Sequence, residues 1–239
     1  MIHPRIIAHR CGGALAPENT LAGLRIAARI GCRGVEFDAM LGADGVPVLI
    51  HDETLERTTS GRGSVAAIDS TRLMLLDAGC RHHRAFSGEP VPSLDQALRL
   101  CASLGLWANV EIKPAAGQEA ETGRAVARVA AAIGGKLLLS SFSAQALQAA
   151  AIEAPPLPRA MLVEAVPADW LLLLEQSGSL ALHCAANALT EDQALAVRNA
   201  GYALACYTVN SRDEAARLFA LGISAVFSDR PDLWQAAEM

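Results

Sequence analysis

Charged and histidine side chains follow several predicted β-strands of this sequence, at the points where those strands end. They are His9-Arg10, Glu36 with Asp38, His51-Asp52, and Glu111 with Lys113. In a parallel α/β barrel the carboxyl ends of all strands meet at one face, and enzymes with this fold build their active sites there. The placement of these residues is typical of a metal-dependent hydrolase.

Two of the carboxylates are separated by a single residue in an apolar run. Glu36 and Asp38 would therefore project from the same face of a β-strand. Their repulsion calls for a shared proton, a cationic neighbour or a metal, and Glu111 at the end of the next barrel strand would complete an all-oxygen site. Such a site suits Mg²⁺, with Ca²⁺ and Mn²⁺ as alternatives. The competing interpretation is that the carboxylates pair with Arg10 and Lys113.

The stretch after Asp38 predicts a β-hairpin closed by Ala43-Asp44-Gly45, a turn-forming triplet between apolar runs. A turn centred on residues 43 and 44 places His51 opposite Glu36, and one centred on residues 44 and 45 places it opposite Asp38. His9 reaches the same edge from the first strand. Two histidines that titrate near neutral pH could act as general acid and base at a phosphoester.

Eight strands that alternate with helices predict the fold. The predicted strands are residues 6–8, 34–41, 107–112, 137–139, 159–163, 180–183, 203–207 and 224–227, and predicted helices include 21–30, 94–104, 190–200 and 211–221. Asn19 is the expected N-cap of the first of these helices. Short apolar strands between helices indicate a parallel sheet buried on both faces. We therefore predict a (β/α)8 TIM barrel, with residues 1–239 as one domain.

One segment breaks the alternation. Residues 53–92 are rich in Thr, Ser, Gly, Arg and His and have little periodicity. Long irregular insertions in compact domains usually carry function or are disordered. Because this one directly follows His51-Asp52, after the second barrel strand, we predict that it caps the barrel mouth.

The composition limits the partners. Hydrophobic residues make up 52% of the chain, charged residues 19%, and the formal net charge is −5. This balance argues against binding to nucleic acid or to an anionic membrane. Phosphate recognition must then come from local cations, for which Arg10 offers forked donors and Lys113 a point charge.

Several further features predict a cytoplasmic protein that does not insert into a membrane. The first residues leave no room for a signal peptide before the first strand, and no apolar run is long enough to span a bilayer. The six cysteines are scattered without a CxxC pair, which suits reduced thiols. A homodimer is left open, because the apolar residues 170–174 could form either a barrel helix or a dimer contact.

The motifs taken together resemble the glycerophosphodiester phosphodiesterase family. They are His9-Arg10, Ala16-Pro17-Glu18-Asn19-Thr20, Glu36-Phe37-Asp38, His51-Asp52, Glu111-Ile112-Lys113, Ser140-Ser141-Phe142 and Tyr207-Thr208-Val209-Asn210. The match runs in order along nearly the whole chain. Residues 55–59, Leu-Glu-Arg-Thr-Thr, look most like the bacterial cytoplasmic enzyme associated with glycerol-phosphate uptake.

This resemblance implies the role of each site residue. A TIM barrel with a small inserted subdomain would hold a divalent metal on its carboxylates, its two histidines would be general acid and base, two cations would hold the phosphate, and two aromatic rings would line the pocket. The metal ligands would be Glu36, Asp38 and Glu111, and the general acid and base would be His9 and His51. The phosphate would be held by Arg10 and Lys113, and the rings that line the pocket would be Phe142 and Tyr207.

The implied reaction is hydrolysis of glycerophosphodiesters, such as glycerophosphocholine and glycerophosphoethanolamine, to sn-glycerol 3-phosphate and an alcohol. Two alternatives are a lysophospholipase D-type phosphodiesterase and a noncatalytic phosphodiester-binding barrel. One residue departs from the family pattern, since Cys11 stands where the family usually has glycine. We expect a locally different loop if that glycine serves a special backbone angle, and a site sensitive to thiol reagents.

Overall fold

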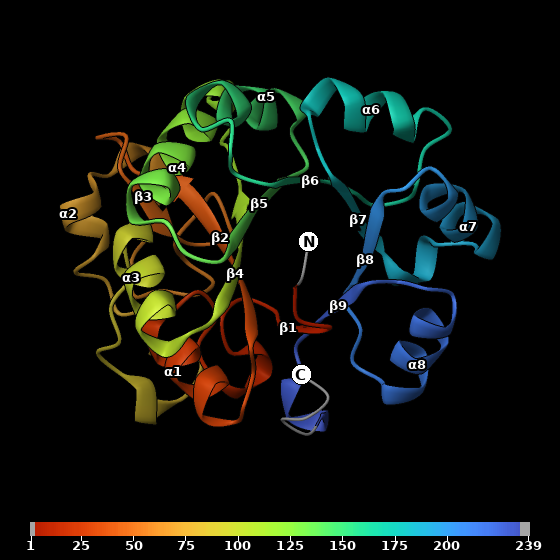
Figure 1. The fold of residues 1–239 in the computed structure, drawn as a ribbon. Helices are drawn as coiled ribbons and strands as arrows, with labels where there is room; N and C mark the ends of the chain where they lie inside the picture. The colour runs from red at the N-terminus through yellow and green to blue at the C-terminus, as the bar shows by residue number, and fades with distance from the viewer. Residues whose placement is uncertain (1–2, 235–239) are drawn as a thin grey trace.

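The computed structural model of the chain describes residues 3–234; residues 1, 2 and 235–239 of the predicted domain lie outside this range. Eight parallel strands form a closed ring, in the order β1-β9-β8-β7-β6-β5-β4-β2 with β1 paired to β2. Helices surround the ring on its outer side (Figure 1). The strands are β1 (Ile6–Ala8), β2 (Gly34–Leu41), β4 (Trp107–Ile112), β5 (Leu137–Ser141), β6 (Arg159–Val163), β7 (Ala181–Ala185), β8 (Ala203–Tyr207) and β9 (Ala225–Ser228). The predicted (β/α)8 barrel is confirmed.

The outer helices bury apolar stripes against the strands. They are α1 (Leu21–Arg29), α3 (Leu94–Leu104), α4 (Glu119–Ile133), α5 (Ala144–Glu153), α6 (Trp170–Ser177), α7 (Glu191–Asn199) and α8 (Arg212–Ala220). Thr190 begins α7 with a complete capping box, in which its side chain and that of Gln193 each bind the other residue's backbone amide. Among the described residues, no helix is long and apolar enough to cross a bilayer.

The prediction that Asn19 caps α1 is wrong. The N-cap is Thr20, whose side-chain oxygen accepts a hydrogen bond from the Gly23 amide. Asn19 instead adopts a left-handed backbone conformation with φ of 58°, which asparagine tolerates better than most residues. Its amide side chain is therefore free to enter the barrel.

The predicted hairpin forms, but in neither predicted register. Strand β3 (Pro47–Leu49) pairs antiparallel with β2 and places Ala39 opposite Leu49. Its loop has three residues, Ala43–Gly45, and Gly45 has a φ of 73°. The predicted turns had two residues, 43 and 44 or 44 and 45. A loop of three residues gives a pairing that differs by one residue from each of them. The Ile50 amide consequently donates to the Asp38 carbonyl at 3.2 Å, so Ile50, and not His51, lies opposite Asp38.

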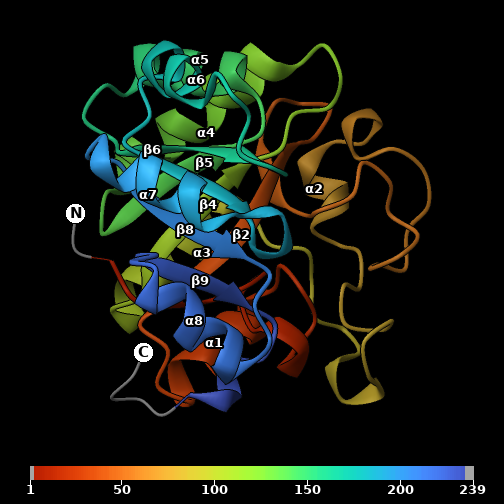
Figure 2. The same ribbon diagram turned by 90° about the vertical axis from the view of Figure 1, so that its right-hand side faces the viewer.

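The inserted segment has little regular structure and a small core of its own. It contains η2 (Val65–Ala67), α2 (Ser70–Leu73) and η3 (Arg84–Phe86). Leu55, Val65 and Leu73 are buried in a cluster separate from the main core. Figure 2 shows the segment beyond the end of the barrel to which the strands point, which is the face that carries the predicted site.

Candidate active site

A cavity of about 270 Å³ opens at the carboxyl face of the barrel. All nine predicted site residues line it: His9, Arg10, Glu36, Asp38, His51, Glu111, Lys113, Phe142 and Tyr207. Their side chains come from residues spread over nearly 200 positions of the chain. Most of them lie on parallel strands of the ring or just after one, and His51 follows the antiparallel strand β3. The predicted convergence at one face is therefore present.

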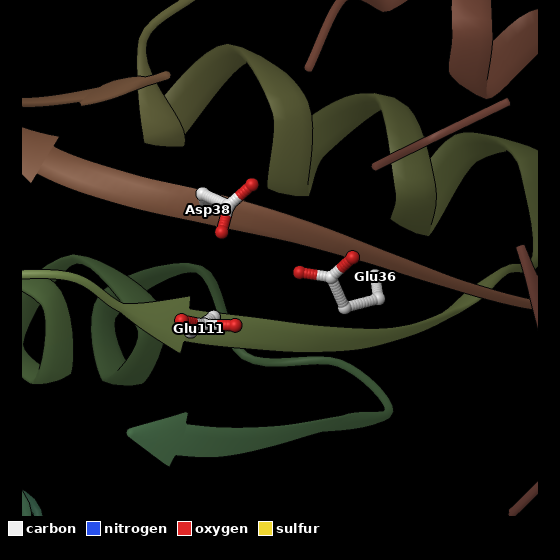
Figure 3. A group of neighbouring side chains, drawn as sticks. All are labelled: Glu36, Asp38 and Glu111. Atoms are coloured by element: carbon white, nitrogen blue, oxygen red, sulfur yellow. The ribbon is translucent and has the colours of Figure 1, made fainter. Parts of the chain in front are cut away.

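The three carboxylates face one another inside this cavity. Glu36 and Asp38 project from β2, and Glu111 projects from β4, where it is in register with Asp38 (Figure 3). One oxygen from each side chain lies within 4.8 Å of the others. Burial, followed by the charges of Asp38 and Glu111, raises the pKa of Glu36 well above its usual range. Burial and the charge of Asp38 likewise raise the pKa of Glu111.

This cluster fits a hard divalent cation. Its donors are all oxygens, which Mg²⁺, Ca²⁺ and Mn²⁺ prefer. The Oε1 atom of Glu36 is buried without a hydrogen-bond partner, and an unpaired buried carboxylate oxygen is strongly unfavourable unless a cation meets it. A bound divalent ion would satisfy that oxygen and offset the repulsion among the three charges.

The two cations pair only loosely with the carboxylates. Arg10 Nε lies 3.9 Å from Asp38, and Lys113 Nζ lies 3.5 Å from Glu111 and 3.9 Å from Asp38. The closest contact to Glu36 is a hydrogen bond from the Arg10 backbone amide at 2.8 Å. Two side-chain cations at these distances leave one carboxylate charge without compensation, so simple ion pairing does not account for the cluster.

His9 is oriented by a carboxylate from the opposite end of the chain. Its Nδ1 lies 2.7 Å from Asp229 Oδ1, while its Nε2 lies 3.9 Å from Glu36. Asn210 holds Asp229 in turn, through its amide group and through the Asp229 backbone amide. The bond to Asp229 fixes the orientation of the ring and directs its Nε2 atom into the cavity. Neither Asp229 nor Asn210 was predicted as a site residue, although Asp229 follows directly after β9.

We expect Asp229→Asn to lower kcat by at least about tenfold, because a carboxylate that fixes the tautomer of a catalytic histidine can contribute up to ~10⁴-fold. The thermal midpoint should change little, since Asp229 is partly exposed. Asp232→Asn is the matched control, because Asp232 pairs with Arg230 nearby and outside the cavity. Equal kcat for Asp229→Asn and the control would mean that Asp229 does not act through His9.

His51 has a similar arrangement on the other side of the cluster. Its Nδ1 lies 2.7 Å from Asp52 Oδ1, and its Nε2 lies 3.1 Å from Lys113 Nζ. Burial is the largest influence on this ring and lowers its pKa. His51 is thus a neutral imidazole at pH 7, with Nδ1 protonated and Nε2 as the acceptor.

One asparagine binds Asp38 and another lines the cavity, and neither was predicted as a site residue. Asn19 donates to Asp38 Oδ2 at 2.8 Å and accepts from the Asp38 backbone amide at 3.0 Å. Asn109 lies two residues before Glu111 on β4, so it shares that face of the strand. Its buried Oδ1 lines the cavity without a hydrogen-bond partner.

Two aromatic rings form the apolar wall. Phe142 and Tyr207 meet edge to face with ring centroids 6.1 Å apart. The Tyr207 hydroxyl donates to the Val163 carbonyl at 2.7 Å, which fixes the ring. Phe142 lines the cavity and is 47% exposed, so it is not part of the buried barrel packing.

The loop at Cys11 keeps the backbone angle that suits glycine. Cys11 has a φ of 77°, a left-handed conformation that glycine adopts without strain. The thiol is fully buried against α1, where a Cβ on Gly23 would come within 2.9 Å of the Cys11 Cβ. Burial raises the pKa of this thiol well above its usual value. A protonated, buried thiol is unreactive, contrary to the expected sensitivity to thiol reagents.

We expect Cys11→Gly to be more stable than Cys11→Ala by about 1 kcal/mol, because alanine retains the strain of a left-handed residue and glycine does not. Equilibrium unfolding in urea measures the difference. At the buried Cys32, which is not among the residues with positive φ, alanine should be the more stable of the two replacements. The same order at both positions would contradict a strained backbone at Cys11.

A closed parallel barrel with three carboxylates, two oriented histidines and two cations at its carboxyl edge has the architecture of a hydrolase. The family model described as the glycerophosphoryl diester phosphodiesterase family matches residues 9–233. The chain therefore belongs to this family, and it is an enzyme of the phosphoric diester hydrolase class.

Individual relatives agree with this assignment. A glycerophosphodiester phosphodiesterase of Caldanaerobacter subterraneus is 28% identical, with 95% of this chain and 94% of the relative covered. A solved phosphodiesterase of Oleispira antarctica, in complex with the product sn-glycerol-3-phosphate, is 36% identical, with a TM-score of 0.93 and coverage of 97% and 95%. The glycerophosphodiester phosphodiesterase of Agrobacterium tumefaciens is 29% identical, with a TM-score of 0.80 and coverage of 98% and 99%.

Proposed function

We propose that the enzyme hydrolyses glycerophosphodiesters to sn-glycerol 3-phosphate and a free alcohol, with the nine residues of the cavity as its catalytic and binding groups. The observation that carries the proposal is the convergence of those residues in one cavity. The Oleispira antarctica relative was solved with sn-glycerol-3-phosphate bound, which supports the choice of product. The family assignment supports the reaction class.

In this proposal Glu36, Asp38 and Glu111 hold the divalent ion, with Mg²⁺ as the expected ion. A bound ion supplies a Lewis acid for a phosphoryl oxygen. Arg10 Nε lies 3.9 Å from Asp38 and Lys113 Nζ lies 3.5 Å from Glu111, and both cations would bind the remaining phosphate charge. Cations fixed in a partly buried cavity stabilise charge that develops in the transition state more than mobile solvent does.

His9 and His51 divide the proton transfers between them. Each is a ring whose Nδ1 is held by an aspartate, so Nε2 is the atom that exchanges a proton with the substrate. One Nε2 removes the proton of the nucleophile, and the other protonates the departing alkoxide. Either assignment of the two histidines satisfies this geometry, and the nucleophile is either water or the neighbouring glycerol hydroxyl.

A comparison of substrates tests the function. Purified enzyme with Mg²⁺ is given glycerophosphoethanolamine or lysophosphatidylethanolamine, and sn-glycerol 3-phosphate or lysophosphatidic acid is measured. We expect rapid release of sn-glycerol 3-phosphate from the first and little cleavage of the second. Preferential cleavage of the lysophospholipid would favour the lysophospholipase D-type alternative. Binding of both without turnover would favour the noncatalytic barrel.

The predicted cytoplasmic location also belongs to this proposal. The thiols of all six cysteines are free, and five of them are buried. Reduced cysteines suit the cytoplasm better than an oxidising compartment.

A further inference from the structure

Arg57 of the inserted segment bridges two carboxylates, Glu18 and Asp52. Its Nη1 and Nη2 each donate to a Glu18 oxygen at 2.8 Å. Its Nε and Nη2 also donate to the two oxygens of Asp52, the latter at 2.9 Å. All three guanidinium nitrogens are therefore used in two bidentate pairs, which is the geometry that arginine offers and lysine does not.

Each of the two carboxylates contacts a different group of the proposed machinery. Asp52 holds the Nδ1 atom of His51 at 2.7 Å. Glu18 accepts from Arg10 Nη1 at 3.3 Å. These contacts thus form a continuous series from His51 through Asp52, Arg57 and Glu18 to Arg10. The imidazole is neutral, and the four groups that follow it alternate between negative and positive charge.

Arg57 acts on these groups from outside the catalytic cavity. It does not line that cavity, but lines a neighbouring hollow of about 160 Å³ together with Glu18 and Arg81. It therefore reaches the site through Asp52 and Glu18. Its hydrogen bonds also lower the pKa of Asp52, and they are the main reason that the pKa of Glu18 is lowered despite burial. Both carboxylates are accordingly held as anions.

We propose that Arg57 is a positioning residue that holds His51 through Asp52 and Arg10 through Glu18, so that the inserted segment completes the active site. The inference rests on the proposed function, because it assigns His51 to proton transfer and Arg10 to phosphate binding. Without Arg57, Asp52 and Glu18 lose their shared partner, and the imidazole and the guanidinium that they hold become free to reorient.

The first test compares Arg57→Lys and Arg57→Ala with the wild type on glycerophosphoethanolamine. We expect both variants to lose at least about tenfold in kcat/KM, the usual effect of removing a group that orients a catalytic ligand or base. Lysine should recover little of the loss, because one ammonium cannot make two bidentate pairs. Arg99→Ala is the matched control, since it removes an exposed bidentate pair with Asp95 remote from the cavity residues.

The second test is chemical rescue. Arg57 is 47% exposed in its side chain, so the space left in Arg57→Ala is open to solvent. Added guanidinium at millimolar concentration should raise kcat/KM of Arg57→Ala several-fold and leave the wild type and Arg99→Ala unchanged. A residue that only anchors the inserted segment would lower the thermal midpoint without this rescue.

A third measurement separates the effect of Arg57 on His51, through Asp52, from its effect on Arg10, through Glu18. Asp52→Asn should chiefly reduce kcat through His51, and Glu18→Gln should chiefly raise KM through Arg10. When either change is combined with Arg57→Ala, the fold loss in kcat/KM should be smaller than the product of the two single losses, since the paired residues act as one unit. Multiplicative losses, or an unchanged kcat/KM in Arg57→Ala, would overturn the positioning role. Absence of turnover in the wild type would instead reject the proposed function.

Discussion

Replacing His9 or His51 with asparagine should lower kcat for glycerophosphoethanolamine by roughly 10²- to 10⁴-fold, the range of general acid or base catalysis. Asparagine retains a hydrogen-bonding group but cannot transfer a proton at neutral pH. Both rings are oriented by aspartates at 2.7 Å, so each substitution should remove one well-defined function. Steady-state release of sn-glycerol 3-phosphate measures the loss.

A second substrate distinguishes the two histidines. With a nitrophenyl leaving group, which departs without protonation, the variant that lacks the general acid should recover much of its activity, whereas the variant that lacks the base should not. His82→Asn is the control, because His82 is an exposed histidine of the inserted segment. Equal losses for both substrates in both variants would contradict a division into acid and base.

The substitutions Glu36→Gln and Asp38→Asn should abolish metal-dependent turnover and also remove most of the stabilisation that the metal gives to the wild type. The raised pKa of Glu36 means that stability declines as the pH rises above the ordinary carboxyl pKa of 4.5, because the folded protein resists ionisation. At pH 8 without metal, Glu36→Gln should therefore unfold at a higher temperature than the wild type.

Added Mg²⁺ should reverse that order. An ion at 100 times its dissociation constant stabilises the folded state by about 2.7 kcal/mol, which corresponds to roughly 5 to 10 °C for a chain of this size. The wild type should gain this shift, and Glu36→Gln should gain little. Glu121→Gln is the control, because Glu121 is an exposed carboxylate on α4 outside the cavity. An equal shift in all three proteins would place the ion elsewhere.

The fold was predictable because its signals are local. Strands such as Gly34–Leu41 and Trp107–Ile112 are compact apolar runs between glycine and charged residues, and they match the predicted ranges. The nine site residues were predictable because they are polar or aromatic side chains within or just after such runs. The closed ring of the barrel then brings them together without further information from the sequence.

The errors come from backbone details and from contacts between distant residues. The hairpin register depends on one residue of loop length, which apolar alternation does not determine. Asn19 and Thr20 are both good N-cap residues, and the sequence gives no sign that Asp38 binds the first of them. Asp229 reaches His9 across 220 positions and Arg57 reaches Glu18 across 39, so neither contact has a signal in the neighbouring sequence.

Restoration of activity by added metal is the most direct test that catalysis depends on an ion held by Glu36, Asp38 and Glu111. The enzyme is stripped with EDTA, freed of chelator and titrated with Mg²⁺ while release of sn-glycerol 3-phosphate from glycerophosphoethanolamine is followed, with Glu36→Gln titrated in parallel. We predict no release from the stripped wild type, recovery that saturates near one bound ion per chain, and no recovery in Glu36→Gln. Full activity of the stripped enzyme, or equal recovery in the variant, would contradict catalysis by a metal held on Glu36, Asp38 and Glu111.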